Sequence, residues 1–181
     1  MSKVFFIADL HLDHKNIVKF SGGLRGGSTL EEHNKWIVKQ WNSVVGKRDT
    51  VFILGDVSFS KAGLKYLKQM RGQKRLIMGN HDNFNPEVYS PYFNKVGGII
   101  KKYGMWLSHS PLHPSELRGL INIHGHIHNN GKVTLSETDP TLDTRYFNVN
   151  VDCLYGVPIE LGEIIKRTGQ EVVCSTPTRD S

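Results

Sequence analysis

Short apolar runs and amphipathic segments alternate along the first half of the chain. Residues 4–8, 51–54 and 76–78 are predicted to be buried strands, because each run is apolar, barely alternates and ends at a glycine or a polar residue. An amphipathic helix is predicted over residues 30–45, and a second one stops at Gly72. This order of strands and helices predicts a parallel sheet with right-handed crossovers.

The helix over residues 30–45 has a clear start signal. Thr29 and Glu32 have the spacing of a capping box, in which each side chain accepts a hydrogen bond from the other residue's backbone amide. Side chains then recur at helical intervals. The positions on that face are Leu30, His33, Trp36, Ile37, Gln40, Trp41 and Val44.

The pattern changes after Asp82. Residues 83–91 are rich in asparagine and proline, which predicts a loop with a short helix. Few residues separate the apolar runs that follow, so this half is predicted to be sheet joined by hairpins, with a last helix over residues 158–166 and a frayed tail over 176–181. The predicted strands of this half are residues 98–102, 105–108, 120–124, 133–135 and 145–152.

Polar side chains follow five of the predicted strands where each strand ends. Taken singly, each has an ordinary explanation as a turn residue or a surface histidine. The spacing favours another explanation. Asp9 and His11 are two residues apart, and extended backbone would project both to one side; His126 and His128 repeat this spacing. We therefore expect the strand ends to converge, and the residues that follow them are Asp9, His11, Asp56, Asn80, His81, Asp82, His109, His126 and His128.

These side chains form a donor set suited to metal ions. Carboxylate, imidazole and amide groups without thiolates favour Mn, Fe, Co, Ni or Zn. Without His81 and Asp82, seven of these residues remain as ligands, which are too many for one tetrahedral ion and match two ions that share a bridging carboxylate. Two ions roughly 3.5–4 Å apart can bind both the attacking and the leaving oxygen at phosphorus, which predicts a hydrolase for phosphate esters.

Five ordered motifs over residues 4–128 resemble those of the calcineurin-like metallophosphoesterase superfamily. They are Asp9-x-His11, Gly55-Asp56, Gly79-Asn80-His81-Asp82, Ser108-His109 and Gly125-His126-x-His128. The resemblance implies a single α/β domain over residues 1–181, with two mixed sheets packed as a sandwich and flanked by helices. It also implies two metal sites that share Asp56. One site would use Asp9, His11, Asp56 and His128, and the other Asp56, Asn80, His109 and His126.

The resemblance further implies a hydroxide between the two ions as nucleophile. His81 would protonate the departing oxygen or support charge on the phosphoryl group. Asp82 would orient His81, with a simple turn role as the alternative. Many members have glycine where this chain has Ser108, a change that should not disturb ligation by His109. Mn²⁺ is the favoured ion, with Fe²⁺, Ni²⁺, Co²⁺ and Zn²⁺ as alternatives.

Four further residues are candidates for substrate contact. His14 and Asn16 resemble an extension of the first motif that is seen in small, single-domain members, including phage-encoded ones. Arg25 lies in a glycine-rich loop and is the side chain there best suited to fork a phosphate. His113 and His124 match no ligand position and are expected to be structural, with His113 the better placed to face substrate.

Composition limits the partners and the compartment. The chain has 23 lysines and arginines against 17 acidic residues, a net charge of +6 that permits an anionic partner such as nucleic acid without demonstrating one. Cys153 and Cys174 match no zinc or redox spacing. The apolar run at residues 4–8 is too short for a signal peptide or a membrane span. A cytoplasmic protein with no membrane partner is expected, either a monomer or a homodimer.

Several functions remain compatible with the motifs. A phosphodiesterase acting on small nucleotide-like substrates is favoured, and a phosphomonoesterase is the alternative. A nuclease acting on single-stranded nucleic acid is also compatible, although larger nucleases with these motifs usually carry extra domains to hold DNA. A non-catalytic scaffold on the same fold is disfavoured, because the chain retains His81 and every ligand.

Overall fold

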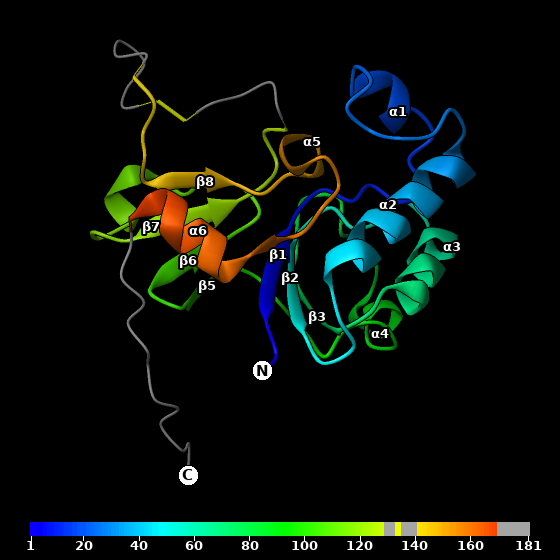
Figure 1. The fold of residues 1–181 in the computed structure, drawn as a ribbon, viewed down its shortest axis with the longest axis horizontal. Coiled ribbons are helices and arrows are strands. Elements are labelled where there is room, and N and C mark those ends of the chain that lie inside the picture. The colour runs from blue at the N-terminus through cyan, green and yellow to red at the C-terminus, as the bar shows by residue number, and fades with distance from the viewer. Residues whose placement is uncertain (129–132, 135–140, 170–181) are drawn as a thin grey trace.

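The computed structural model describes residues 1–128, 133–134 and 141–169. Within them, two mixed β-sheets lie next to each other with helices around them (Figure 1). The first sheet has the strand order β4-β3-β2-β1-β9, and the second has the order β5-β6-β7-β8. This arrangement confirms the α/β fold with two mixed sheets and flanking helices that the resemblance implied.

The first sheet is mainly parallel. Strands β1 to β4 run parallel to their neighbours, and β9 pairs with β1 in the antiparallel direction. The parallel crossovers predicted for the first half of the chain are therefore present. The strands are β1 (Val4–Ile7), β2 (Thr50–Leu54), β3 (Gln73–Ile77), β4 (Lys95–Gly97) and β9 (Ile159–Glu160).

The second sheet differs from its prediction. Only the β5–β6 pair is antiparallel, whereas β6–β7 and β7–β8 are parallel, so the expected series of hairpins is wrong. The connections over residues 108–120 and 125–145 are long enough to return the chain to the same end of the sheet, as parallel pairing requires. The strands are β5 (Ile100–Lys102), β6 (Met105–Leu107), β7 (Ile121–His124) and β8 (Tyr146–Asn148).

Two predicted strands need correction. The strand expected over residues 98–102 begins only at Ile100, because β4 ends at Gly97 in the first sheet and the chain then changes sheets. The strand expected over 145–152 ends at Asn148, and the chain enters a short helix. Thr134 forms an isolated bridge with Leu142. Leu135, Cys174 and the tail expected over 176–181 lie outside the described residues.

The helices cover the sheets and carry the connections. The predicted capping box is confirmed: Thr29 Oγ1 accepts from the Glu32 amide at 3.2 Å, and Glu32 Oε2 accepts from the Thr29 amide at 3.1 Å. The second predicted helix is instead α3 followed by a 3₁₀ helix, Lys65–Gln69. The α-helices are α1 (Ile17–Phe20), α2 (Leu30–Val44), α3 (Lys61–Leu64), α4 (Pro86–Tyr89), α5 (Val151–Leu154) and α6 (Leu161–Thr168).

Strand β1 is buried on both faces, which explains its lack of alternation. Phe5 and Ile7 belong to the core between the first sheet and the helices, together with Trp41 of α2. Phe6 and Ala8 point the other way, into the core that the two sheets share. Among the described residues, no helix is both long and apolar enough to cross a membrane.

The capping box allows a direct test of α2. Thr29→Ala should lower the free energy of unfolding by about 1 kcal/mol, because the Glu32 amide loses its acceptor. Thr29→Ser retains a hydroxyl and should stay close to the wild type. Urea unfolding measures both variants, and equal midpoints for alanine and serine would show that the cap contributes no stability.

Candidate metal centre

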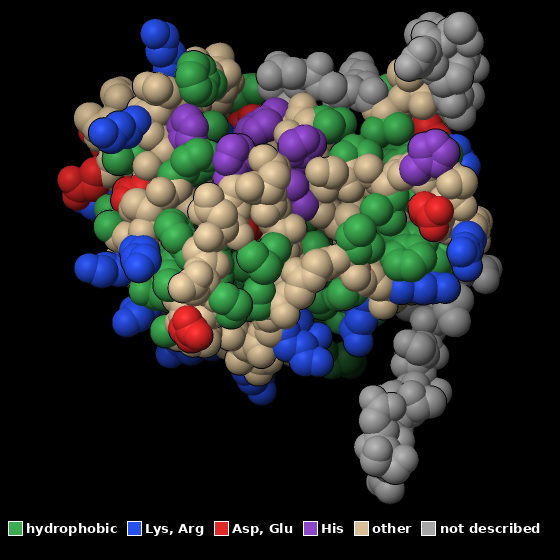
Figure 2. All heavy atoms as spheres, turned by 180° about the vertical axis from the view of Figure 1, so that it is seen from behind, with side chains coloured by type: hydrophobic (Ala, Val, Ile, Leu, Met, Phe, Trp, Pro, Cys, Tyr) green, Lys and Arg blue, Asp and Glu red, His purple; other side chains and the backbone are tan. Residues whose placement is uncertain are grey.

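The connections that leave five strands bring all seven predicted metal ligands together. Parallel pairing places the carboxyl ends of β1, β2 and β3 at one edge of the first sheet, and β6 and β7 likewise end together. Histidine side chains accordingly gather in one patch of the surface, while lysines and arginines lie mostly toward the margins of that face (Figure 2). Two groups of potential ligands result, Asp9 with His11 and His128, and Asp56 with His109 and His126.

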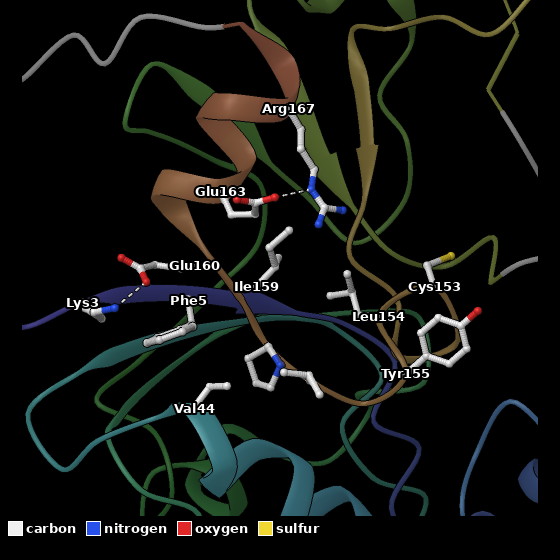
Figure 3. Close-up of a pocket in the computed structure, with 12 residues that line it drawn as sticks. Lys3, Phe5, Val44, Cys153, Leu154, Tyr155, Ile159, Glu160, Glu163 and Arg167 are labelled. Carbon is white, nitrogen blue, oxygen red and sulfur yellow. Dashed lines mark hydrogen bonds and ion pairs between the residues drawn. The ribbon is translucent and has the colours of Figure 1, made fainter.

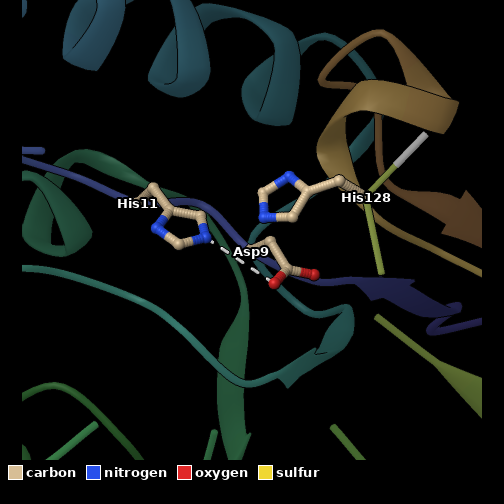
Figure 4. Close-up of side chains that lie close together, drawn as sticks. All are labelled: Asp9, His11 and His128. Carbon is tan, nitrogen blue, oxygen red and sulfur yellow. Dashed lines mark ion pairs between the residues drawn. The ribbon is translucent and has the colours of Figure 1, made fainter. Parts of the chain in front are cut away.

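The first group combines Asp9 and His11, which follow β1, with His128, which follows β7. Its three ligand atoms lie within 4.8 Å of one another, and the carboxylate of Asp9 faces the two imidazoles (Figure 4). His11 Nε2 is 3.7 Å from Asp9 Oδ1, too far for a hydrogen bond. Both of these atoms are buried and have no hydrogen-bond partner in the described part of the chain. Buried polar atoms are rarely left unpaired, so this donor set fits a cation.

The second group centres on His109. Its Nδ1 lies 2.8 Å from the carbonyl oxygen of Leu54, the geometry of an N–H donor, so the lone pair of a neutral ring would be on Nε2. That Nε2 lies 2.9 Å from Asn80 Oδ1, 3.1 Å from His126 Nδ1 and 3.4 Å from Asp56 Oδ2. Four donors thus converge on one point, as around a metal ion.

Asp56 lies between the two groups. Its Oδ2 is 3.7 Å from His11 Nε2 and 3.4 Å from His109 Nε2, while its Oδ1 accepts from the His81 amide at 3.0 Å. Burial alone would raise the pKa of Asp56, but its contact with His109 and nearby positive charge lower that pKa to about 2. The carboxylate is therefore ionised at neutral pH and faces both candidate sites.

The backbone at these positions is unusual. The prediction that extended backbone aligns each pair is wrong, because φ is 59° at Asp9, 50° at His11, 68° at His126 and 48° at His128. Asp56 adds a fifth left-handed residue, with φ of 54°. Non-glycine residues rarely adopt this conformation, which costs free energy and concentrates at functional sites. The side chains converge through tight turns and not through strand alternation.

Two motif glycines allow the close approach. A Cβ on Gly79 would collide with the Asp56 carboxylate, and a Cβ on Gly125 would collide with the Asp9 carboxylate. The φ of Gly79 is not in the left-handed range, so glycine is required at this position for space and not for a backbone conformation that other residues avoid.

The two predicted catalytic residues are placed differently. His81 is exposed beside the ligand groups, with its ring centre 6.1 Å from that of His11. The Asp82 carboxylate accepts from the backbone amides of Asp56, Val57 and Gly79 at 2.8–2.9 Å. Both oxygens of Asp82 are thus used to join the turns after β2 and β3, which favours its structural role over the orientation of His81.

Of the predicted substrate contacts His14, Asn16 and His113, one borders the candidate metal centre and two do not. His14 lines a pocket of about 260 Å³ together with His11, His81 and His128. Asn16 precedes α1, and His113 is bonded to Ser115 at 2.8 Å; neither lines this pocket. His124 is buried, and its Nδ1 lies 2.9 Å from the Gly125 carbonyl oxygen, as expected for a structural role.

Arg25 requires a correction. Its side chain is buried, and Nη1 and Nη2 donate to the carbonyl oxygens of Leu10 and Asp9 at 3.1 and 2.9 Å. Its Nε donates to Asp152 Oδ1 at 2.6 Å. The guanidinium therefore faces protein groups and not a phosphate, because a carboxylate far along the chain draws it inward.

Asp152 was missed by the sequence analysis. Its second oxygen, Oδ2, is 2.7 Å from His128 Nδ1, which leaves Nε2 of that ring for a metal ion. Burial would raise the pKa of Asp152, but His128 and Arg25 lower it. The sequence did contain a signal for it. Asp152 lies at the end of the strand predicted over residues 145–152, and the candidate ligands likewise follow predicted strands.

A larger hollow of about 590 Å³ lies elsewhere on the molecule (Figure 3). None of the residues that line it is a candidate metal ligand. Its charged side chains neutralise one another, since Lys3 pairs with Glu160 at 2.7 Å and Arg167 pairs with Glu163 at 2.8 Å. Its size alone therefore does not make it the reaction site.

A sequence profile of the calcineurin-like phosphoesterase family matches residues 2–159. The chain belongs to this family. Members of the family are generally hydrolases that bind divalent metals, which agrees with the two ligand groups. The resemblance carried by the five motifs is thereby confirmed.

The relatives of this calcineurin-like phosphoesterase extend over most of its length. An uncharacterized protein of Methanocaldococcus jannaschii is 34% identical over 172 residues, covering 92% of this chain and 91% of that protein. The gene 66 protein of Mycobacterium phage L5 is 33% identical over 168 residues, covering 71% of this chain and 78% of the phage protein. The crystal structure of a protein of unknown function from Aquifex aeolicus has a TM-score of 0.70 at 26% identity, covering 92% and 99% of the two chains.

The contact between Asp152 and His128 predicts an effect on metal affinity. In Asp152→Asn, the imidazole loses a charged acceptor, and the affinity for Mn²⁺ should fall roughly 10- to 100-fold. Calorimetric titration of the metal-free calcineurin-like phosphoesterase measures this. Asp49→Asn is the control, because that carboxylate accepts backbone amides of Lys3 and Gly46 at the opposite end of β2. Wild-type affinity in Asp152→Asn would contradict the assignment.

Proposed function

We propose that this protein is a phosphodiesterase that uses two divalent ions, with Mn²⁺ favoured, to hydrolyse small nucleotide-like phosphate esters. The observation that carries the proposal is the place of Asp56 Oδ2, which faces His11 Nε2 and His109 Nε2 at 3.7 and 3.4 Å. One carboxylate oxygen is thus shared by two groups of donors. The residues that would hold the first ion are Asp9, His11, Asp56 and His128, and those for the second are Asp56, Asn80, His109 and His126.

The chemistry of the donors supports two ions of this kind. Nitrogen and oxygen donors without thiolates suit first-row divalent metals. When bound, such ions activate water at neutral pH and stabilise the charge that develops on a phosphoryl group. Asp9 and His11 provide buried donor atoms with no hydrogen-bond partner among the described residues, and a cation would satisfy them.

The surrounding residues hold the imidazoles in place. The Leu54 carbonyl fixes the ring of His109, and the Asp152 carboxylate fixes that of His128, so that Nε2 of each ring faces its site. The backbone amide of His126 donates to Asp9 Oδ2 at 2.9 Å. This bond ties the connection after β7 to the one after β1. The donors are therefore preorganised before substrate arrives.

His81 is assigned to the departing oxygen. It lies outside both ligand groups and is exposed beside them, so its ring is free to meet substrate. An imidazole is suited to transfer a proton to an alkoxide as the P–O bond breaks.

The place of Arg25 favours a diester over a monoester. A phosphomonoester carries close to two negative charges, and Arg25 and His14 are the two candidate substrate contacts that could help to accommodate them. The guanidinium is instead bonded to Asp152 and to two carbonyl oxygens. A diester has a single negative charge and places less demand on such a residue.

Removal of metal and substitution of the bridge test the mechanism together. Chelator treatment should abolish hydrolysis of bis-p-nitrophenyl phosphate, and Mn²⁺ should restore it. Asp56→Asn should lower kcat by about 10³-fold or more, because two ions would lose their shared anion. Asp49→Asn should retain activity. Chelator-resistant hydrolysis, or Asp56→Asn protein with near wild-type kcat, would contradict the proposal.

The role of His81 predicts a dependence on the leaving group. His81→Asn should lower kcat roughly 10²- to 10⁴-fold for diesters with an alkoxide leaving group. The loss should be much smaller for p-nitrophenolate, which departs without protonation. Affinity for Mn²⁺ should not change, and His113→Asn serves as the control. Equal losses for both leaving groups would exclude proton donation by His81.

A further inference from the structure

A pocket beside the candidate metal centre is bordered by aromatic rings. Its volume is about 260 Å³. Its lining includes His11, His81 and His128 of the proposed reaction site, together with His14, Phe20 and Phe59. Because three of the lining residues belong to the proposed reaction site, whatever occupies this pocket is adjacent to the scissile phosphate.

Phe59 is held firmly among imidazoles. Its ring stacks on that of His11 with a centre-to-centre distance of 5.3 Å, and its edge meets the ring of His14 at 4.2 Å. The ring of His81 is 4.8 Å away. Phe59 nevertheless remains 38% exposed. It therefore presents a fixed aromatic surface to the pocket.

Phe20 is the second phenylalanine that lines this pocket. Helix α1 is anchored by Ile17 and by Ser21 at its C-terminal end, both of which are buried. Phe20 is left 67% exposed, and the ring centre of His14 lies 6.0 Å from that of Phe20. Packing in the interior explains the apolar side chain of Ile17, but it does not explain that of Phe20. A lone exposed phenylalanine is ordinary, but two on one pocket next to a reaction site need an explanation.

We propose that this pocket is a stacking subsite for one planar ring of the substrate, a nucleobase, whose phosphate lies at the candidate metal centre. The inference rests on the proposed function and specifies its substrate class. The pocket is smaller than the roughly 300–1,000 Å³ that holds a whole ligand of drug size, so it suits one ring system and not an entire nucleotide. Every base has a π-face, and Phe and His rings are suitable platforms.

The polar groups of the pocket imply tolerance of base identity. The Ser21 hydroxyl already donates to Val18, and His14 Nδ1 accepts from the Asn16 amide at 3.3 Å. Both oxygens of Asp152 are bonded to Arg25 and His128. Few groups remain to read the edge of a base, so recognition would come from stacking and the four bases should be used within about tenfold of one another.

The test compares two substrates that differ only in the ring. Thymidylyl-thymidine and its analogues with one thymine replaced by an abasic site have the same phosphodiester and the same kind of leaving group. The Mn²⁺-loaded wild-type protein should have a kcat/KM roughly 5- to 100-fold higher for the base-bearing substrate than for the analogue that lacks the stacked ring.

Phe20→Ala should lower kcat/KM for the base-bearing substrate far more than for the abasic substrate, so that the preference is lost. Phe20→Tyr keeps a ring and should restore the preference. Tyr155→Ala is the matched control, because Tyr155 is 65% exposed and lines the hollow of Figure 3. Phe59→Ala should also lower the preference, but it touches His11 and His81 and is therefore the second variant.

A binding measurement separates failure of the subsite from failure of the proposed function. Calorimetry with adenosine 5′-monophosphate and ribose 5-phosphate should show tighter binding of the nucleotide, and Phe20→Ala should abolish the difference. Equal use of both substrates by an active wild-type protein, or equal losses for both in Phe20→Ala, would overturn the subsite while leaving the phosphodiesterase intact. Absence of any diester hydrolysis, with the binding difference present, would instead reject the function and keep the ring-binding pocket.

Discussion

The position of the Asp56 carboxylate is the constraint on which the rest of the site depends. Asp82 accepts from the backbone amides of Asp56, Val57 and Gly79, so one buried carboxylate fixes the turns after β2 and β3 against each other. The His81 amide then holds one oxygen of Asp56, and the lack of a side chain on Gly79 leaves room for it. The other oxygen is free to face both groups of ligands.

This arrangement concentrates unfavourable features in a small volume. Five candidate ligands have left-handed backbone, and several donor atoms are buried without partners among the described residues. Such features persist only where the surrounding structure determines them strongly. Here the surrounding structure is β1, buried on both faces between two apolar cores, from whose end Asp9 and His11 emerge. Ordinary packing thus supports an arrangement that would be unstable by itself.

Hydrogen bonds within the site also connect the two sheets. Arg25 binds the carbonyl oxygens of Asp9 and Leu10 and, through Asp152, reaches His128 from the second sheet. The bond from the His126 amide to Asp9 makes a second connection between the sheets. Because both candidate ligand groups combine residues that follow strands of the two sheets, the relative position of the sheets determines the geometry of each group. In the proposal above, substrate recognition depends on the side chains around the metal centre. Phe20 and Phe59 take the place of Arg25 there as the proposed contacts to substrate.

The sequence alone determined which strands are buried, where α2 begins, which family the chain resembles and which polar residues follow the strand ends. These features are local, because apolar runs, a capping box and short motifs are set by neighbouring residues. Tertiary structure decided the direction of the second sheet's strands, the left-handed turns at Asp9 and His126, and the partner of Arg25. A glycine-rich loop gives no sign that its arginine will meet a carboxylate 127 positions later. Such a pairing depends on the path of the whole chain, because only the packed sheets bring these two distant charges together. Once both are buried, each needs the other as a partner.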